Sequence, residues 1–295
     1  MSALAVGARS KPIVRLMRPH QWTKNAVVLA GVVFSGNAAD PVQLTRAVIA
    51  VLAFCLVSSA VYVFNDWHDR EEDQLHPTKR RRPIASGEIS SAAALVLAGG
   101  LLLSALALGV AITPALAGII ALYAVLMVAY TLWWRSVAIL DVVVIAFGFV
   151  LRAVAGAVAV SVPLSPWLFI CTLLLALTLG LGKRRQELGM LRGDVGHHRP
   201  SLEAYAELDL DRVILGAGML TIIAYTSYAL AVPNFGRDLP MFLTVPFVAA
   251  AIWRYLYLVL RRNLGGTPES LLFRDRPLFL MILSWSVAVA VVLTS

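Results

Sequence analysis

The chain has 295 residues, of which 59% are hydrophobic and only 14% are charged, and its formal net charge is +8 at pH 7. Soluble domains carry nearer a quarter of charged residues, so this composition excludes an ordinary soluble protein and indicates an integral membrane protein. The apolar runs are long and do not alternate, which favours membrane-spanning helices. In such a chain the positive net charge does not indicate nucleic-acid binding.

Nine candidate membrane spans follow one another, each near the roughly 20 apolar residues that a crossing requires. They cover about residues 22–36, 44–65, 90–112, 115–134, 137–160, 165–184, 212–232, 240–260 and 275–294. We therefore expect an all-α polytopic membrane protein, with residues 1–295 forming a single transmembrane helical domain. Cys55 and Cys171 lie inside apolar runs without metal-ligand spacing, so we infer no disulfide.

The positive charges lie almost entirely on one side of these spans. If nine spans alternate, all 25 Lys and Arg residues fall on the N-terminal side except Arg46, Arg237 and Arg152, the last within a span. The positive-inside rule then places the N-terminus in the cytoplasm. The two longest loops, residues 66–89 and 185–211, face the cytoplasm as well, and we expect them to cap an active site there.

The acidic stretch Asn65–Asp73 follows the second span. If residues 62–73 are helical, Tyr62, Asp66, Asp69 and Asp73 share one stripe and Asn65 stacks under Asp69. Three clustered carboxylates repel one another, so a cation should lie between them. We predict that Asn65, Asp66, Asp69 and Asp73 hold Mg²⁺ together with substrate phosphate oxygens, and that the three aspartates are catalytic. A solvated acidic helix end is the alternative.

Two basic segments accompany this stretch. Lys79–Arg82 lies between Pro77 and Pro83, which favour a shaped loop, and its four cations suit the oxygens of a diphosphate that also ligates the metal. Topogenic charge that contacts anionic lipid is the alternative. Lys183–Glu187 ends the sixth span, and there we expect Glu187 to belong to a second phosphate-facing edge, opposite the Asn65–Asp73 stretch. Snorkelling, complementation of the helix dipole and a Lys183–Glu187 surface pair are the alternatives.

Arg152 lies in the middle of the fifth span, eleven residues from Asp141 and on nearly the same face. A buried intramembrane charge costs at least ~2.5 kcal/mol on insertion scales, so we expect a partner or a ligand. Pairing with Asp141 or another acid and contact with a lipid phosphate are equally consistent with the sequence. Lys24, just inside the apolar boundary of the first span, and Tyr62 are further candidates for substrate binding.

These motifs together resemble a known family. The pattern Asn65-Asp66-x-x-Asp69-x-x-x-Asp73, followed by His-Pro-Thr-Lys-Arg-x-Arg-Pro-Ile-Ala-x-Gly at residues 76–87, resembles the UbiA superfamily of intramembrane prenyltransferases. That superfamily has nine transmembrane helices around a central cavity. Ordinary members carry a second motif of the D-x-x-x-D kind after the sixth span, whereas residues 182–188 of this chain retain only Glu187. With Arg-Pro-x-Gln-Trp-x-Lys-Asn at residues 18–25, the chain resembles the decaprenyl-phosphate phosphoribosyltransferase branch.

The resemblance implies an enzyme that uses Mg²⁺ to transfer 5-phosphoribose from phosphoribosyl pyrophosphate to a polyprenyl phosphate, as in the synthesis of cell-wall precursors. It places the four metal-site residues at the diphosphate. It places these residues around the donor or acceptor phosphates: Lys24, Lys79, Arg82, Lys183, Arg184 and Glu187. Three phosphate groups on the donor and one on the lipid call for more cations and fewer carboxylates. We expect a multi-pass protein of the cell (inner) membrane with its site facing the cytoplasm, and homo-oligomerisation stays open.

Two other functions compete with this hypothesis. A UbiA-type prenyltransferase would use a polyprenyl diphosphate as donor and an aromatic or other acceptor, and the missing second acidic motif counts against it. A transporter or flippase for phospholipids or phosphosugars would need charged residues on both sides of the membrane. The connections on the opposite side are nearly bare of charge.

Overall fold

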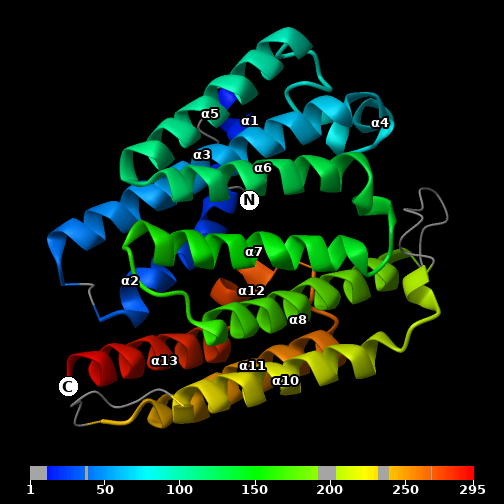
Figure 1. Cartoon of the computed structure of the whole chain (residues 1–295). Helices are drawn as coiled ribbons and strands as arrows, with labels where there is room; N and C mark the ends of the chain where they lie inside the picture. Colours follow the sequence, from blue (N-terminus) through cyan, green and yellow to red (C-terminus); the bar gives the residue numbers. More distant parts are fainter. Residues whose placement is uncertain (1–11, 37–38, 192–203, 232–238, 267) are drawn as a thin grey trace, which may run out of the picture.

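The structure is a computed structural model, and it describes residues 12–36, 39–191, 204–231, 239–266 and 268–295. Within these ranges every regular element is a helix (Figure 1). The helices are α1 (Pro12–Met17), η1 (Pro19–Leu29), α2 (Ala30–Phe34), α3 (Pro41–His68), α4 (Arg70–Leu75), η2 (Lys79–Arg81), α5 (Ser91–Ile112), α6 (Pro114–Leu132), η3 (Trp134–Ser136), α7 (Leu140–Ala159), α8 (Pro166–Leu191), α10 (Leu210–Ala231), η4 (Met241–Thr244), α11 (Val245–Arg262), α12 (Pro268–Arg274) and α13 (Arg276–Thr294). The prediction of an all-α fold is confirmed.

Eight stretches of the described chain are helical, long and apolar enough to cross a membrane, with η4 and α11 forming one of them. They match the last eight predicted spans to within a few residues. The first predicted span, 22–36, is a 3₁₀-helix, η1, that continues into the short helix α2. A 3₁₀-helix rises about 2.0 Å per residue, so η1 and α2 together extend about 30 Å, the thickness of a bilayer core. Eight candidate spans are thus found in the described residues, and η1 with α2 occupies the place of the ninth predicted one.

Short polar side chains fix where several spans begin. The Asp40 carboxylate accepts hydrogen bonds from the amides of Val42 (2.8 Å) and Gln43 at the start of α3. Other side-chain caps described at spanning helices are Ser90 for α5, Thr113 for α6, Asp209 for α10 and Asp275 for α13. Such caps satisfy amides that have no partner inside the helix, which matters most next to a membrane.

Helix α7 joins the two halves of the bundle and lies between them in Figure 1. Its Val144, Ala155 and Ala159 pack in a core with α3, α5 and α6, and its Val142 packs in a second core with α8, α10 and α11. The η1–α2 segment crosses α7 in direct backbone contact. A Cβ added at Gly156 would lie 1.8 Å from the Val28 carbonyl oxygen, so only glycine allows this crossing.

The polar connections gather at one end of the bundle. Figure 1 shows α4 and the C-terminal end of α8 at this end, whereas α2 and the C-terminus lie at the opposite end. The first predicted loop, residues 66–89, thus begins with the last turn of α3 and continues through α4. The second begins with the last turns of α8, and its residues 192–203 lie outside the described residues.

Candidate active site

The acidic edge, which we define as residues 65–82, starts where α3 ends. α3 stops at His68 and α4 starts at Arg70, yet the amide of Asp69 still bonds to the Asn65 carbonyl (2.9 Å) and the amide of Asp73 to the Asp69 carbonyl (2.8 Å). The helical path predicted for residues 62–73 therefore persists through a small irregularity at Asp69. Asp66 and Asp73 remain on one face.

Arg82 bridges these two aspartates. Its Nη1 atom lies 3.0 Å from Asp66 Oδ1 and 2.6 Å from Asp73 Oδ2, and the two residues are only 2% and 1% exposed. Arg18 Nη2 donates to the same Asp66 oxygen (2.5 Å), and Lys79 Nζ lies 4.0 Å from Asp73. Two buried carboxylates thus converge on a single cationic atom. The sequence predicted a cation between these carboxylates, and in this structure the Arg82 side chain occupies that position.

The loop that carries Lys79 and Arg82 has a defined shape. The His76 ring nitrogen Nδ1 accepts hydrogen bonds from the amides of Thr78 (3.2 Å) and Lys79 (3.4 Å). Ile84 is buried in a core cluster with residues of α1, α3 and α5, which anchors the chain two residues beyond Arg82. The guanidinium is therefore held above the aspartates by local structure as well as by charge.

Asn65 and Asp69 point to α6 and its following turn. The Thr131 hydroxyl donates a hydrogen bond to Asn65 Oδ1, and Arg135 Nη1 donates one to Asp69 Oδ1 (2.5 Å). Arg135 was not among the predicted site residues, although it is the lone cation after the fourth predicted span. In the described part of the chain, no three acidic, His or Cys side chains converge as a metal site. The four predicted metal-site residues therefore have different partners here: Asp66 and Asp73 share Arg82, Asn65 contacts Thr131, and Asp69 contacts Arg135.

The basic edge, residues 182–187, is built differently. Arg184 is 2% exposed, its Nε atom lies 3.0 Å from Oδ2 of the fully buried Asp141, and its Nη1 also pairs with Glu187. We expected Arg184 and Glu187 to face a substrate phosphate. Their placement instead favours a structural role, because the guanidinium is enclosed by two carboxylates. Lys183 is half exposed and lies 3.9 Å from Glu187.

Tyr205 closes the other side of Asp141. Its hydroxyl donates to Asp141 Oδ1 (2.6 Å) and accepts from the Ile139 amide (2.7 Å). Ile139 has φ = 70°, a strained value for a β-branched residue, and forms a γ-turn with a Leu140 amide to Ala138 carbonyl bond of 2.8 Å. Burial, followed by the hydrogen bond to Asp141, raises the pKa of the Tyr205 hydroxyl. Tyr205 therefore stays protonated and stabilises the start of α7.

Two further residues of the basic edge connect helices. Arg185 donates to the carbonyls of Val259 (2.8 Å) and Leu260 (3.1 Å) at the end of α11, and pairs with Asp211 of α10. Gln186 Oε1 accepts from the Gly266 amide. The basic edge thus holds α7, α8, α10 and α11 together at this end of the bundle.

Arg152 lies inside the bundle and does not contact Asp141, which pairs with Arg184 instead. Its guanidinium donates to Asn25 Oδ1 (2.8 Å), the Tyr123 hydroxyl (2.7 Å) and the Gly148 carbonyl (3.0 Å). Lys24 is half buried next to Asn25 on η1. The Tyr62 ring lies 5.2 Å from the guanidinium of Arg18, the residue that binds Asp66.

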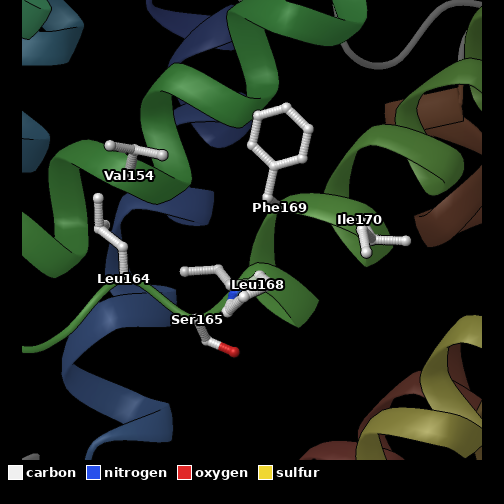
Figure 2. Close-up of a pocket in the computed structure, with 7 residues that line it drawn as sticks. Val154, Leu164, Ser165, Leu168, Phe169 and Ile170 are labelled. Carbon is white, nitrogen blue, oxygen red and sulfur yellow. The ribbon is translucent and has the colours of Figure 1, made fainter.

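An apolar pocket lies away from these polar groups. It has a volume of about 380 Å³ and lies between α7 and the beginning of α8. Figure 2 shows Val154, Leu164, Leu168 and Phe169 around it, with Ser165 as the one labelled polar side chain. Val154 is two residues from Arg152, so the two side chains leave α7 on opposite faces. The pocket is suited to hydrocarbon and holds no group for catalysis.

Comparison with known proteins places this arrangement in a family. Residues 26–292 match the UbiA prenyltransferase family. The decaprenyl-phosphate phosphoribosyltransferase of Mycolicibacterium smegmatis is 32% identical over 92% of this chain and 89% of its own length. The protein of the same name from Mycobacterium tuberculosis H37Rv is 34% identical over 92% and 91%.

Solved structures share the fold at lower identity. A UbiA homolog from Archaeoglobus fulgidus bound to GPP and Mg²⁺ superposes with a TM-score of 0.73 at 18% identity, covering 96% of this chain and all of that chain. The apo UbiA homolog from Aeropyrum pernix K1 gives a TM-score of 0.63 at 15% identity, with 96% of each chain covered. The chain is therefore a multi-pass membrane protein that belongs to the UbiA prenyltransferase family.

Proposed function

We propose that this protein transfers 5-phosphoribose from phosphoribosyl pyrophosphate to a polyprenyl phosphate such as decaprenyl phosphate, with release of diphosphate. The observation that carries the proposal is the 32–34% identity, over nine-tenths of both chains, to proteins named decaprenyl-phosphate phosphoribosyltransferase. The missing second acidic motif adds support, because residues 182–188, where an ordinary prenyltransferase would place that motif, retain Glu187 as their single carboxylate.

The acidic edge fits a Mg²⁺ ion. Mg²⁺ prefers oxygen ligands and is commonly held by one or two carboxylates together with waters and substrate phosphates. Asp66 and Asp73 already direct one oxygen each to a single point, now taken by Arg82 Nη1. When bound, the ion would withdraw electron density from the departing diphosphate.

The cations around this edge have a direct role in the proposal. Arg82 and Lys79 bind diphosphate oxygens once those oxygens enter the edge, and Arg18 and Arg135 keep Asp66 and Asp69 in place. Positive groups aimed at the leaving group stabilise the charge that develops as the ribose C1 bond breaks. The lipid phosphate oxygen attacks C1 from the opposite face. Because that oxygen is already anionic, the reaction requires no strong general base.

The location of the reaction follows from the charge distribution. The positive-inside rule favours a cytoplasmic position for the end of the bundle that carries the acidic and basic edges. Phosphoribosyl pyrophosphate is soluble and would enter from that side. The polyprenyl tail would remain in the apolar phase. We therefore propose a cell (inner) membrane enzyme whose active site opens to the cytoplasm.

The product of the reaction tests this proposal. Purified protein in detergent is incubated with radiolabelled phosphoribosyl pyrophosphate, Mg²⁺ and a polyprenyl phosphate, and the lipid fraction is examined by mass spectrometry. We expect a phosphoribosylated lipid and free diphosphate, neither of which forms when Mg²⁺ is chelated. A prenylated acceptor formed from polyprenyl diphosphate, without any phosphoribosyl lipid, would instead establish an ordinary prenyltransferase. Movement of lipid across liposomes without a covalent product would establish a transporter.

A further inference from the structure

Arg152 is a buried cation whose close partners are all neutral. It lies twelve residues after the start of α7, about 18 Å along the helix, and is 5% exposed. Its three hydrogen bonds go to an amide oxygen, a phenol and a main-chain carbonyl. Among the described residues, no Asp or Glu oxygen lies within 4.0 Å of its guanidinium. Arg184 and Arg254, which also lie in spanning helices, each contact a carboxylate.

The Arg152 guanidinium has more N–H donors than its hydrogen bonds use. Arginine carries five N–H groups, and the three hydrogen bonds of Arg152 use three of them. The Tyr123 and Phe149 rings lie 4.7 Å and 5.1 Å from the guanidinium carbon and stabilise the charge without neutralising it. A cation held this way inside a membrane protein is a binding group for an anion.

The residues around Arg152 hold it in one position. The Asn25 amide that accepts from Arg152 is itself held by Ser58 Oγ and Cys55 Sγ, both at 3.3 Å. The Gly156 crossing presses η1 against α7 one turn beyond Arg152. A charged group that is fixed before its ligand arrives loses little conformational entropy on binding. The site is therefore preorganised rather than assembled by the ligand.

Polar side chains connect this site with the acidic edge. Lys24 precedes Asn25 on η1, and Asn25 accepts a hydrogen bond from Arg152. Tyr62 in turn packs under Arg18, which binds Asp66. An anion bound at Arg152 would thus lie on the membrane side of the metal-binding aspartates, with Lys24 and Tyr62 between them.

We propose that Arg152, supported by Tyr123 and Lys24, binds the phosphate of the polyprenyl phosphate acceptor. This inference rests on the proposed function. Placing the soluble donor at this depth would bury several phosphate charges, whereas the acceptor brings one phosphate on an apolar tail. The acceptor's tail already lies in the apolar phase, so only one phosphate group has to be accommodated at this depth. The deeper of the two anion sites therefore belongs to the lipid.

Binding of a short lipid tests the inference without turnover. The probes are farnesyl phosphate, farnesol and inorganic phosphate, each added to the purified wild type, R152K, R152Q and Y123F, with thermal stabilisation as the readout. We expect farnesyl phosphate to stabilise the wild type, with at least tenfold weaker binding to R152Q and intermediate binding to R152K and Y123F. Farnesol should bind the variants and the wild type equally. R254Q, which alters another arginine in a span, should keep wild-type affinity for farnesyl phosphate.

Steady-state kinetics separate acceptor from donor. R152K and Y123F should raise the KM for the acceptor several-fold and leave the KM for phosphoribosyl pyrophosphate within twofold of the wild type. A raised donor KM with an unchanged acceptor KM would assign Arg152 to the donor instead.

Unchanged binding of farnesyl phosphate by R152K and Y123F would overturn the inference. Stabilisation by inorganic phosphate alone would show a site for free anions rather than for the lipid. If the wild type binds farnesyl phosphate through Arg152 but forms no phosphoribosyl lipid, the proposed function fails and the lipid site stands.

Discussion

The acidic and basic edges lie at the same end of the bundle and both pair arginines with carboxylates, yet they are built for different purposes. At the acidic edge, Arg82 shares its charge between Asp66 and Asp73 and remains partly exposed. At the basic edge, Arg184 is enclosed between Asp141 and Glu187 and is almost fully buried. An ion pair that water and ligands can reach can exchange partners. An enclosed pair cannot do so without leaving a buried charge uncompensated.

This difference shows that the composition of a charged motif does not determine whether the motif binds a ligand or stabilises the fold. The acidic edge offers oxygen atoms that converge on one point and cations that can turn to a phosphate. At the basic edge, Arg184 and Arg185 of α8 already contact three other helices, through Asp141 of α7, Asp211 of α10 and the carbonyls at the end of α11. Substitutions at the two edges should therefore affect different properties, catalysis in one case and stability in the other.

The largest effect is expected from neutralising an aspartate of the acidic edge. D66N or D73N removes one of two carboxylates that would hold the ion, and loss of one such electrostatic group typically lowers kcat by about 10²–10³-fold. The fold should persist, because Arg82 still contacts the remaining carboxylate. E71Q, a change at an exposed position of α4, is the matched control and should retain wild-type turnover. Full activity of D66N at saturating Mg²⁺ would contradict the assignment of this edge to catalysis.

At the basic edge, R184Q should reduce stability rather than chemistry. It leaves Asp141 buried without its cation, and breaking a buried pair costs roughly 3–5 kcal/mol. Unfolding in detergent measures the loss, and the fraction that remains folded should keep a donor KM near that of the wild type. The double variant R184M/D141N removes both charges of this buried pair, so it should recover part of the stability that R184Q loses. A stable R184Q protein with a raised KM for either substrate would return Arg184 to the substrate site.

Arg82 allows the exchange of partners to be measured directly. R82Q removes the cation that competes for Asp66 and Asp73, so Mn²⁺ alone should bind this variant about tenfold more tightly, a change of about 1.4 kcal/mol. Affinity for phosphoribosyl pyrophosphate should fall, because a diphosphate ligand is lost. Titration followed by electron paramagnetic resonance reports the first property, and the donor KM reports the second. R81Q, an exposed neighbour, is the control. Equal Mn²⁺ affinity in R82Q and wild type would show that Arg82 does not occupy the position of the ion.

Much of the fold could be predicted because membrane spans impose length and apolarity on the sequence. The eight α-helical spans and the clustering of charge at one end followed from the apolar runs and from the positions of the cations, whereas caps such as Asp40 and Thr113 were identified only in the structure. The first span could not be predicted as a 3₁₀-helix. It packs closely against Gly156, a residue far away in the sequence, and such a contact cannot be deduced from periodicity.

The site was predicted less completely, because periodicity places residues on a face but does not choose their partners. Asp66 and Asp73 do share a face, as the spacing indicated. The partner of Asp141 could not be deduced, since Arg152 and Arg184 both suited it, and three-dimensional packing selected Arg184. Arg135 and Tyr205 lie in connections without a motif of their own. Only the fold brings them to Asp69 and Asp141.

Tyr205 gives the smallest effect and tests whether the basic edge is a scaffold. Y205F removes the hydroxyl that joins Asp141 to the strained Ile139 turn, and at pH 8 it should lower the free energy of unfolding by about 1 kcal/mol. Because burial raises the pKa of Tyr205 in the folded state, this hydroxyl keeps its proton as pH rises above about 10, whereas the unfolded chain releases it. The unfolded state then gains stability, so the advantage of wild type over Y205F should shrink between pH 8 and pH 10.5. A constant or growing difference would mean that the Tyr205 hydroxyl is not buried against Asp141, and that this end of the bundle is open to ligands after all.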